Sequence, residues 1–134
     1  MKPAMVVTAM LLALPLAACS EEEPEEAAVC TSVDALRASV DDVKGIDVGS
    51  GTALADLQSG LQAVEGDLAD VKADAGDEFA APLEEVETSF ADLETSIETA
   101  TTDESAETLA AAGQALATFG AEVQTLVGDI KATC

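Results

Sequence analysis

The sequence predicts an all-α fold, an up-down-up-down antiparallel four-helix bundle with a short first helix. Two observations carry this prediction. After residue 30, apolar residues recur at alternating steps of three and four in four stretches, and this spacing places each set on one face of a helix. Glycines and helix-capping residue types separate the stretches. Each apolar stripe needs cover from other helices, so a bundle of four is the economical arrangement.

The four predicted stripes are expected to form the core. They are Val33, Leu36, Val40 and Val43; Leu54, Leu57, Leu61, Val64, Leu68 and Val71; Phe79, Leu83, Val86, Phe90, Leu93 and Ile97; and Leu109, Ala112, Leu116, Phe119, Val123, Leu126 and Ile130.

The first predicted helix is capped by Thr31 or Ser32 and ends at Gly45. It reaches only about half the height of the other three at 1.5 Å per residue. The segment from Gly45 to Gly51 is predicted to be extended, which lets it cover the missing distance at about 3.3 Å per residue.

The remaining helices follow from caps and breakers. Thr52 is expected to cap the second helix, and Gly76 to end it. The third helix either begins near Ala81 or is kinked at Pro82, because a proline beyond the first turn removes a helical hydrogen bond. Thr101 and Glu104 are predicted to form the capping box of the fourth helix, which runs to about Ala132.

The N-terminal segment has the features of an export signal. Lys2 is the only charged residue before Cys19, and the stretch from Val6 to Leu16 is almost wholly apolar. Its end, Leu16-Ala17-Ala18-Cys19, resembles the lipobox of bacterial lipoproteins. The resemblance implies cleavage before Cys19, a diacylglyceryl thioether on Cys19, and attachment to a membrane. An ordinary secretory signal and an uncleaved anchor are the alternatives.

The sequence therefore divides into three parts. Residues 1–18 are the predicted lipoprotein signal peptide, residues 19–29 a lipidated acidic tether, and residues 30–134 the helical bundle domain. Repulsion between glutamates and the stiffness of Pro24 are expected to keep the tether extended. The predicted location is the extracytoplasmic face of the cell membrane, or the outer membrane or periplasm in a host with two membranes.

Export also gives the two remaining cysteines a use. Cys30 and Cys134 form an even pair once Cys19 is lipidated, and an exported compartment permits a disulfide. The up-down-up-down path brings both to the end from which the tether leaves. Two free thiols or an intermolecular bridge are the alternatives. The stretch from Cys30 to Cys134 also resembles small uncharacterised secreted helical proteins of actinobacteria, through Cys-x-Ser-Val-Asp-Ala-Leu, the Asp47-Val48 turn and the final cysteine. That resemblance implies no activity.

Composition excludes several classes of function. The chain has 27 acidic and 5 basic residues, a net charge of −22 and no histidine. Nucleic-acid binding is not expected, because it needs lysine and arginine on the phosphates. Without histidine, zinc and copper sites of the His/Cys type are not expected either. No nucleophile elbow or phosphate-binding loop is present, so we expect a protein that is not an enzyme and has no metal or cofactor.

Two features remain as candidate sites. The uncharged stretch from Thr108 to Ala121 carries a candidate apolar groove for a lipid or a partner helix. The groove residues are Leu109, Gly113, Leu116, Gly120 and Val123. The alternative is close helix packing through Gly113 and Gly120. Acidic clusters, with Asp74 to Glu78 the nearest to a loop site, are expected to be solvated, and a calcium site is the alternative.

The sequence thus predicts a membrane-tethered, non-enzymatic binding or structural module of the cell envelope. It contacts the membrane through the acyl anchor on Cys19, and its expected partner is an envelope protein. The alternative is a carrier of a lipid or another apolar ligand, packed against the uncharged helix.

Overall fold

A computed structural model of the chain describes residues 24–47 and 50–134, and side chains from residue 28 onward. The described part is helical, with four long α-helices and no strand. The prediction of an all-α chain with four helices is therefore confirmed. The predicted signal peptide, Cys19 and the start of the tether lie outside the described residues.

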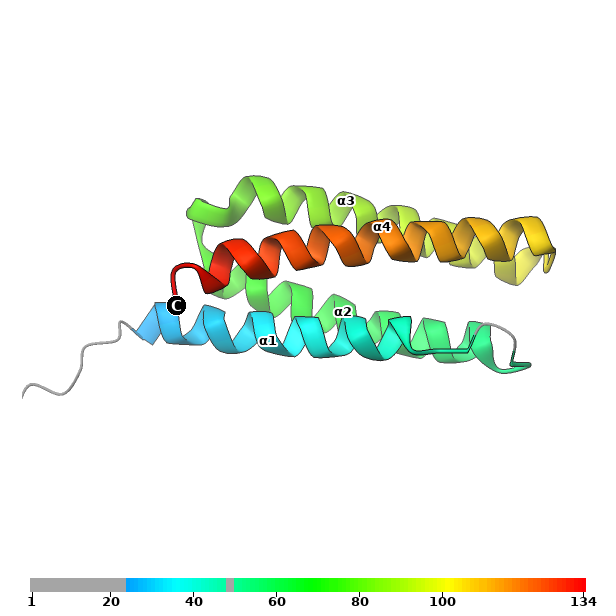
Figure 1. The fold of residues 1–134 in the computed structure, drawn as a ribbon, viewed down its shortest axis with the longest axis horizontal. Coiled ribbons are helices and arrows are strands. Elements are labelled where there is room, and N and C mark those ends of the chain that lie inside the picture. Colours follow the sequence, from blue (N-terminus) through cyan, green and yellow to red (C-terminus); the bar gives the residue numbers. More distant parts are fainter. Residues whose placement is uncertain (1–23, 48–49) are drawn as a thin grey trace, which may run out of the picture.

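The helices follow one another along the chain as α1 (Pro24–Lys44), α2 (Ala53–Ala75), α3 (Ala80–Thr102) and α4 (Ala106–Lys131). A short 3-10 helix, η1 (Asp77–Phe79), joins α2 to α3. The four long helices lie side by side along the long axis of the molecule (Figure 1). Packing is most extensive between α1 and α2 and between α3 and α4, and less extensive between α1 and α4 and between α2 and α3.

The core follows the predicted stripes closely. Every stripe residue is buried except Leu54, Leu109 and Leu116, which are half-buried. No charged or polar side chain is buried among the residues for which burial is described. Phe90 of α3 and Phe119 of α4 form a tilted aromatic pair with ring centroids 5.5 Å apart. The interior is therefore dry, and it holds the helices through apolar packing.

The first helix begins earlier than predicted. It starts at Pro24 rather than at Thr31, so part of the predicted extended tether is helical and the predicted boundary at residue 30 falls inside α1. Proline suits a first helical turn, because the N–H that it lacks would have no partner there. Val29 is 4% exposed and extends the buried stripe by one step of four residues. Burial of Val29 therefore stabilises the additional residues at the start of α1.

The other end of α1 explains why the connection to α2 is long. The stem of Lys44 lies against Gly120, near the middle of α4, so α4 continues well beyond the end of α1. At the opposite end, Cys30 is bridged to Cys134, and the start of α1, from Pro24, projects past the end of α4 (Figure 1). The first helix is thus shifted along the molecule rather than half as long as the others.

The start of α3 resolves the question of Pro82. The helix begins at Ala80, so Pro82 lies in its first turn. Backbone N–H groups of a first turn have no partner inside the helix, and a proline there costs no helical hydrogen bond. Gly76, with a φ of 63°, makes the turn that ends α2 as predicted.

The predicted capping box of the fourth helix is wrong by four residues. Thr101 belongs to α3, where its hydroxyl donates to the carbonyl of Ile97 at 2.9 Å. Ser105 caps α4 instead, and its Oγ accepts from the N–H of Thr108 at 3.2 Å while Thr108 Oγ1 accepts from the N–H of Ser105 at 3.1 Å. Threonine replaces the expected glutamate because its hydroxyl also accepts a hydrogen bond.

Candidate functional site

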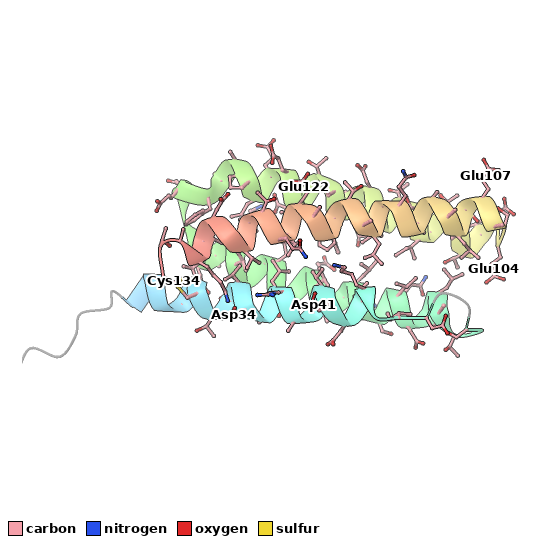
Figure 2. All side chains as sticks on the ribbon, viewed as in Figure 1. Asp34, Asp41, Glu104, Glu107, Glu122 and Cys134 are labelled. Carbon is pink, nitrogen blue, oxygen red and sulfur yellow. A yellow bond between two sulfur atoms is a disulfide. The ribbon has the colours of Figure 1, made fainter. Side chains whose placement is uncertain are left out.

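The uncharged stretch of α4 presents a face of small side chains to solvent. Its exposed residues are Ala110, Ala111, Gly113, Gln114, Ala117, Thr118 and Ala121. Glu107 and Glu122 stand at the two ends of the stretch (Figure 2). The larger apolar residues of this stretch, Leu109, Leu116 and Phe119, are half-buried or buried, so the surface exposed to solvent consists of short, neutral side chains.

Three of the five predicted groove residues meet at one small cavity. Leu109, Gly113 and Leu116 line it from α4, and the rest of the lining is Leu54 and Leu57 of α2, Leu93 and Ile97 of α3, and Ala112. The cavity has a volume of about 20 Å³. That volume holds about one water molecule, and an apolar lining gives water no hydrogen-bond partner. The cavity in this conformation is therefore too small for a lipid.

The other two predicted groove residues lie elsewhere. Gly120 is buried, and a Cβ placed on it would lie 3.4 Å from Cδ of Lys44 in α1. Val123 is 1% exposed and belongs to the core. A Cβ on Gly113 would meet nothing within 4 Å, so the Gly113–Gly120 pair does not mark one close helix contact.

The close approach between two helices occurs instead at a glycine that the sequence analysis did not single out. A Cβ on Gly60 of α2 would lie 2.6 Å from Cγ2 of Val43 and 3.8 Å from Cδ1 of Ile46. Gly60 therefore lets α2 approach the end of α1. The apolar residues at the end of α1 were visible in the sequence, but which glycine faces them depends on the register between the helices.

A second feature that the sequence reading missed is a polar ladder between α1 and α2. The hydroxyl of Ser32 donates to the carboxylate of Asp74, and that of Ser39 donates to the carboxylate of Asp67. The serines are seven residues apart, as are the aspartates, so both pairs lie along the same side of the two helices. These matched spacings were a signal in the sequence. Two members of the acidic clusters therefore help to join helices.

Two ion pairs and the disulfide link α1 and α2 to the other two helices. Lys131 Nζ lies 2.5 Å from Oδ1 of Asp34, and Lys72 Nζ lies 2.6 Å from Oε1 of Glu87. Cys30 and Cys134 are bridged, with their Cα atoms 6.2 Å apart and a separation of 104 positions in the sequence. Asp34 and Cys134 lie at the same end of the molecule (Figure 2).

The remaining acidic residues do not assemble a recognisable metal site in the described part of the chain. No group of three or more histidine, cysteine, aspartate or glutamate residues there is placed to hold a metal ion. Asp74, at the start of the predicted loop site, accepts from Ser32 instead. Several acidic residues thus contact a hydroxyl or a lysine of a neighbouring helix rather than a metal ion.

Comparison with models of known families, with curated proteins and with solved structures finds no match to this chain. Among residues 24–47 and 50–134, no helix is long and apolar enough to cross a membrane.

Proposed function

We propose that this chain is a lipid-anchored extracytoplasmic protein, an up-down-up-down antiparallel four-helix bundle that acts as a non-enzymatic binding or structural module of the cell envelope. The observation that carries the proposal is the Leu16-Ala17-Ala18-Cys19 box behind a short apolar run. The anchor on Cys19 holds the protein at the membrane. It must do so against the charge of the domain, because an acidic protein is repelled by anionic lipid.

The antiparallel path is supported by contacts along the helices. On α1 and α4, Cys30 is bridged to Cys134, Asp34 pairs with Lys131, and Lys44 lies against Gly120. Successive contact positions along α1 thus pair with positions that decrease in number along α4, as in antiparallel helices. Figure 1 shows the chain turning back between successive helices.

The disulfide supports export. Disulfides persist in oxidising compartments outside the cytoplasm and are rare inside it. Cys30 lies eleven positions after Cys19 in the sequence. The bridge therefore lies at the end of the bundle next to the anchor, and the turn between α3 and α4 faces away from the membrane.

A pair of variants tests the anchor. In the native host, Cys19→Ser is expected to move the protein from the membrane fraction to the soluble fraction, with loss of the diacylglycerol mass from the intact protein. Cys134→Ser is the matched control, and it should stay in the membrane fraction. If the wild type and Cys19→Ser are both membrane-bound and both uncleaved before residue 19, the segment is an uncleaved anchor and the lipoprotein proposal is wrong.

The second candidate function, an apolar carrier, is favoured by the cavity between α2, α3 and α4. Leu109, Gly113 and Leu116 line it, as the carrier proposal requires. Because its volume holds about one water molecule, a ligand needs the cavity to widen. Saturable binding of a hydrophobic fluorescent dye to the native protein, displaced by a fatty acid, would support the carrier. A flat titration would exclude it.

A further inference from the structure

The molecule consists of two helical hairpins. The first hairpin is α1 with α2, and the second is α3 with α4. Each hairpin is packed extensively within itself, whereas the contacts of α1 with α4 and of α2 with α3 are fewer. The interface between the hairpins is therefore the weaker seam of the fold.

One end of this seam is closed by strong connections. The turn at Gly76 joins the hairpins through the backbone, and the Cys30–Cys134 bridge joins them a second time. The Lys131–Asp34 and Lys72–Glu87 ion pairs also cross the seam in the half of the molecule near that end. We call this the clamped end.

The opposite end of the seam is built differently. The three predicted core residues that are only half-buried, Leu54, Leu109 and Leu116, all line the cavity at this end. The helix α1 ends before it reaches them, since Lys44 lies beside Gly120. The described residues thus cover the core incompletely here, and we call this end of the seam the free end.

The surface between α2 and α3 also opens toward the free end. A groove of about 710 Å³ lies between them, and its walls include Gln58 and Gln62 of α2 and Ala91 and Thr95 of α3. By contrast, Lys72 and Glu87 of the same two helices touch near the clamped end. Between these two helices an ion pair therefore crosses the seam near the clamped end, whereas a solvent-open groove lies nearer the free end.

We propose that the two hairpins form a hinge that opens at the free end, with the Gly76 turn and the Cys30–Cys134 bridge as its pivot. Opening separates Leu54 and Leu57 from Leu93, Ile97 and Ala112, while the clamped end stays packed. It needs less free energy than global unfolding, because it breaks only the apolar contacts of one end. The hinge does not depend on the lipid anchor, so failure of the lipoprotein proposal leaves it standing.

Thiol accessibility tests the hinge directly. Ala112→Cys places a thiol at the free end, and Val127→Cys places one nearer the clamped end of the same helix. The two positions are 5% and 6% exposed, so static exposure is matched. Both changes are made in the full chain with Cys19→Ser, in which Cys30 and Cys134 are bridged and the introduced thiol is the one free to react. The probe is iodoacetamide under native conditions.

The hinge predicts that the thiol at position 112 reacts about tenfold faster or more than the thiol at position 127, because labelling follows the population of the open form. Equal rates at the two positions would overturn the proposal. This comparison needs no further variant, so it decides the question even if the variants below fail to fold.

Two leucines of α2 separate hinge opening from global unfolding. Leu57 and Leu68 are 4% and 6% exposed, and Leu57 lies at the free end. Leu57→Ala should accelerate labelling at position 112 by about tenfold or more, since it weakens the contacts that opening breaks. Leu68→Ala should accelerate labelling at position 127 and leave position 112 unchanged. If both variants accelerate both positions equally, the protein opens only by unfolding as a whole, and the hinge is wrong.

Discussion

Val43 of α1 occupies the space that a side chain on Gly60 of α2 would need. Its Cγ2 atom lies 2.6 Å from the position of a Cβ at residue 60, and Val43 itself is 2% exposed. Valine is stiff at χ1, because two heavy atoms on its Cβ restrict rotation. Val43 therefore cannot turn aside, and Gly60 sets how closely α1 and α2 approach.

This contact predicts opposite effects for two glycines of α2. Gly60→Ala should lower the free energy of unfolding by about 1 kcal/mol or more, because overpacking outweighs the gain in helix propensity. Gly66→Ala, whose Cβ would meet nothing within 4 Å, should raise it by about 0.5–1 kcal/mol. Urea unfolding of the two variants measures both. A stabilising Gly60→Ala would mean that the helices shift apart without cost.

The disulfide should dominate the stability of the clamped end. Cys134→Ser removes a bridge that closes nearly the whole domain into a ring, and we expect a loss of about 2–5 kcal/mol. Thermal unfolding in oxidising buffer measures the loss. In a reducing buffer that opens the bridge, wild type and variant should melt at nearly the same temperature. An unchanged Tm in oxidising buffer would show that the bridge contributes nothing.

The cap of α4 is testable against the residue that the sequence favoured. Ser105→Ala should cost about 0.5–2 kcal/mol, because the N–H of Thr108 loses its acceptor. Thr101→Ala should change stability by less than about 0.5 kcal/mol, since Thr101 lies on the exposed side of α3. Chemical denaturation of both variants distinguishes the two caps. A larger loss for Thr101→Ala would restore the predicted Thr101 cap.

The charge of the chain predicts a marked response to salt. With a net charge of −22, the folded state repels itself, and added salt screens that repulsion. We expect Tm to rise with sodium chloride, and to rise equally in calcium chloride at matched ionic strength. Calorimetry in both salts is the measurement. A clearly larger rise in calcium would reveal a specific cation site on the acidic surface.

Local pattern predicted most of the secondary structure and nearly all of the core. The three-and-four spacing fixes which face of each helix is apolar, and an apolar face must be buried whatever its partners are. Gly76 and the position of Pro82 set a helix end and a helix start for reasons that involve only neighbouring residues. Of the candidate groove residues, Leu109, Gly113 and Leu116 line one cavity while Gly120 and Val123 do not, and ligand binding there stays a prediction.

The sequence by itself determined the four helices, their buried faces and the pair of cysteines available for a bridge. These depend on residue type and on spacing along one helix. The tertiary structure decided that α1 and α2 approach closely at Gly60 and that Lys44 lies against Gly120. It also decided that Val29 is buried, which favours a first helix that begins at Pro24. Each depends on the register between two helices, which is set by how side chains of distant segments fit together.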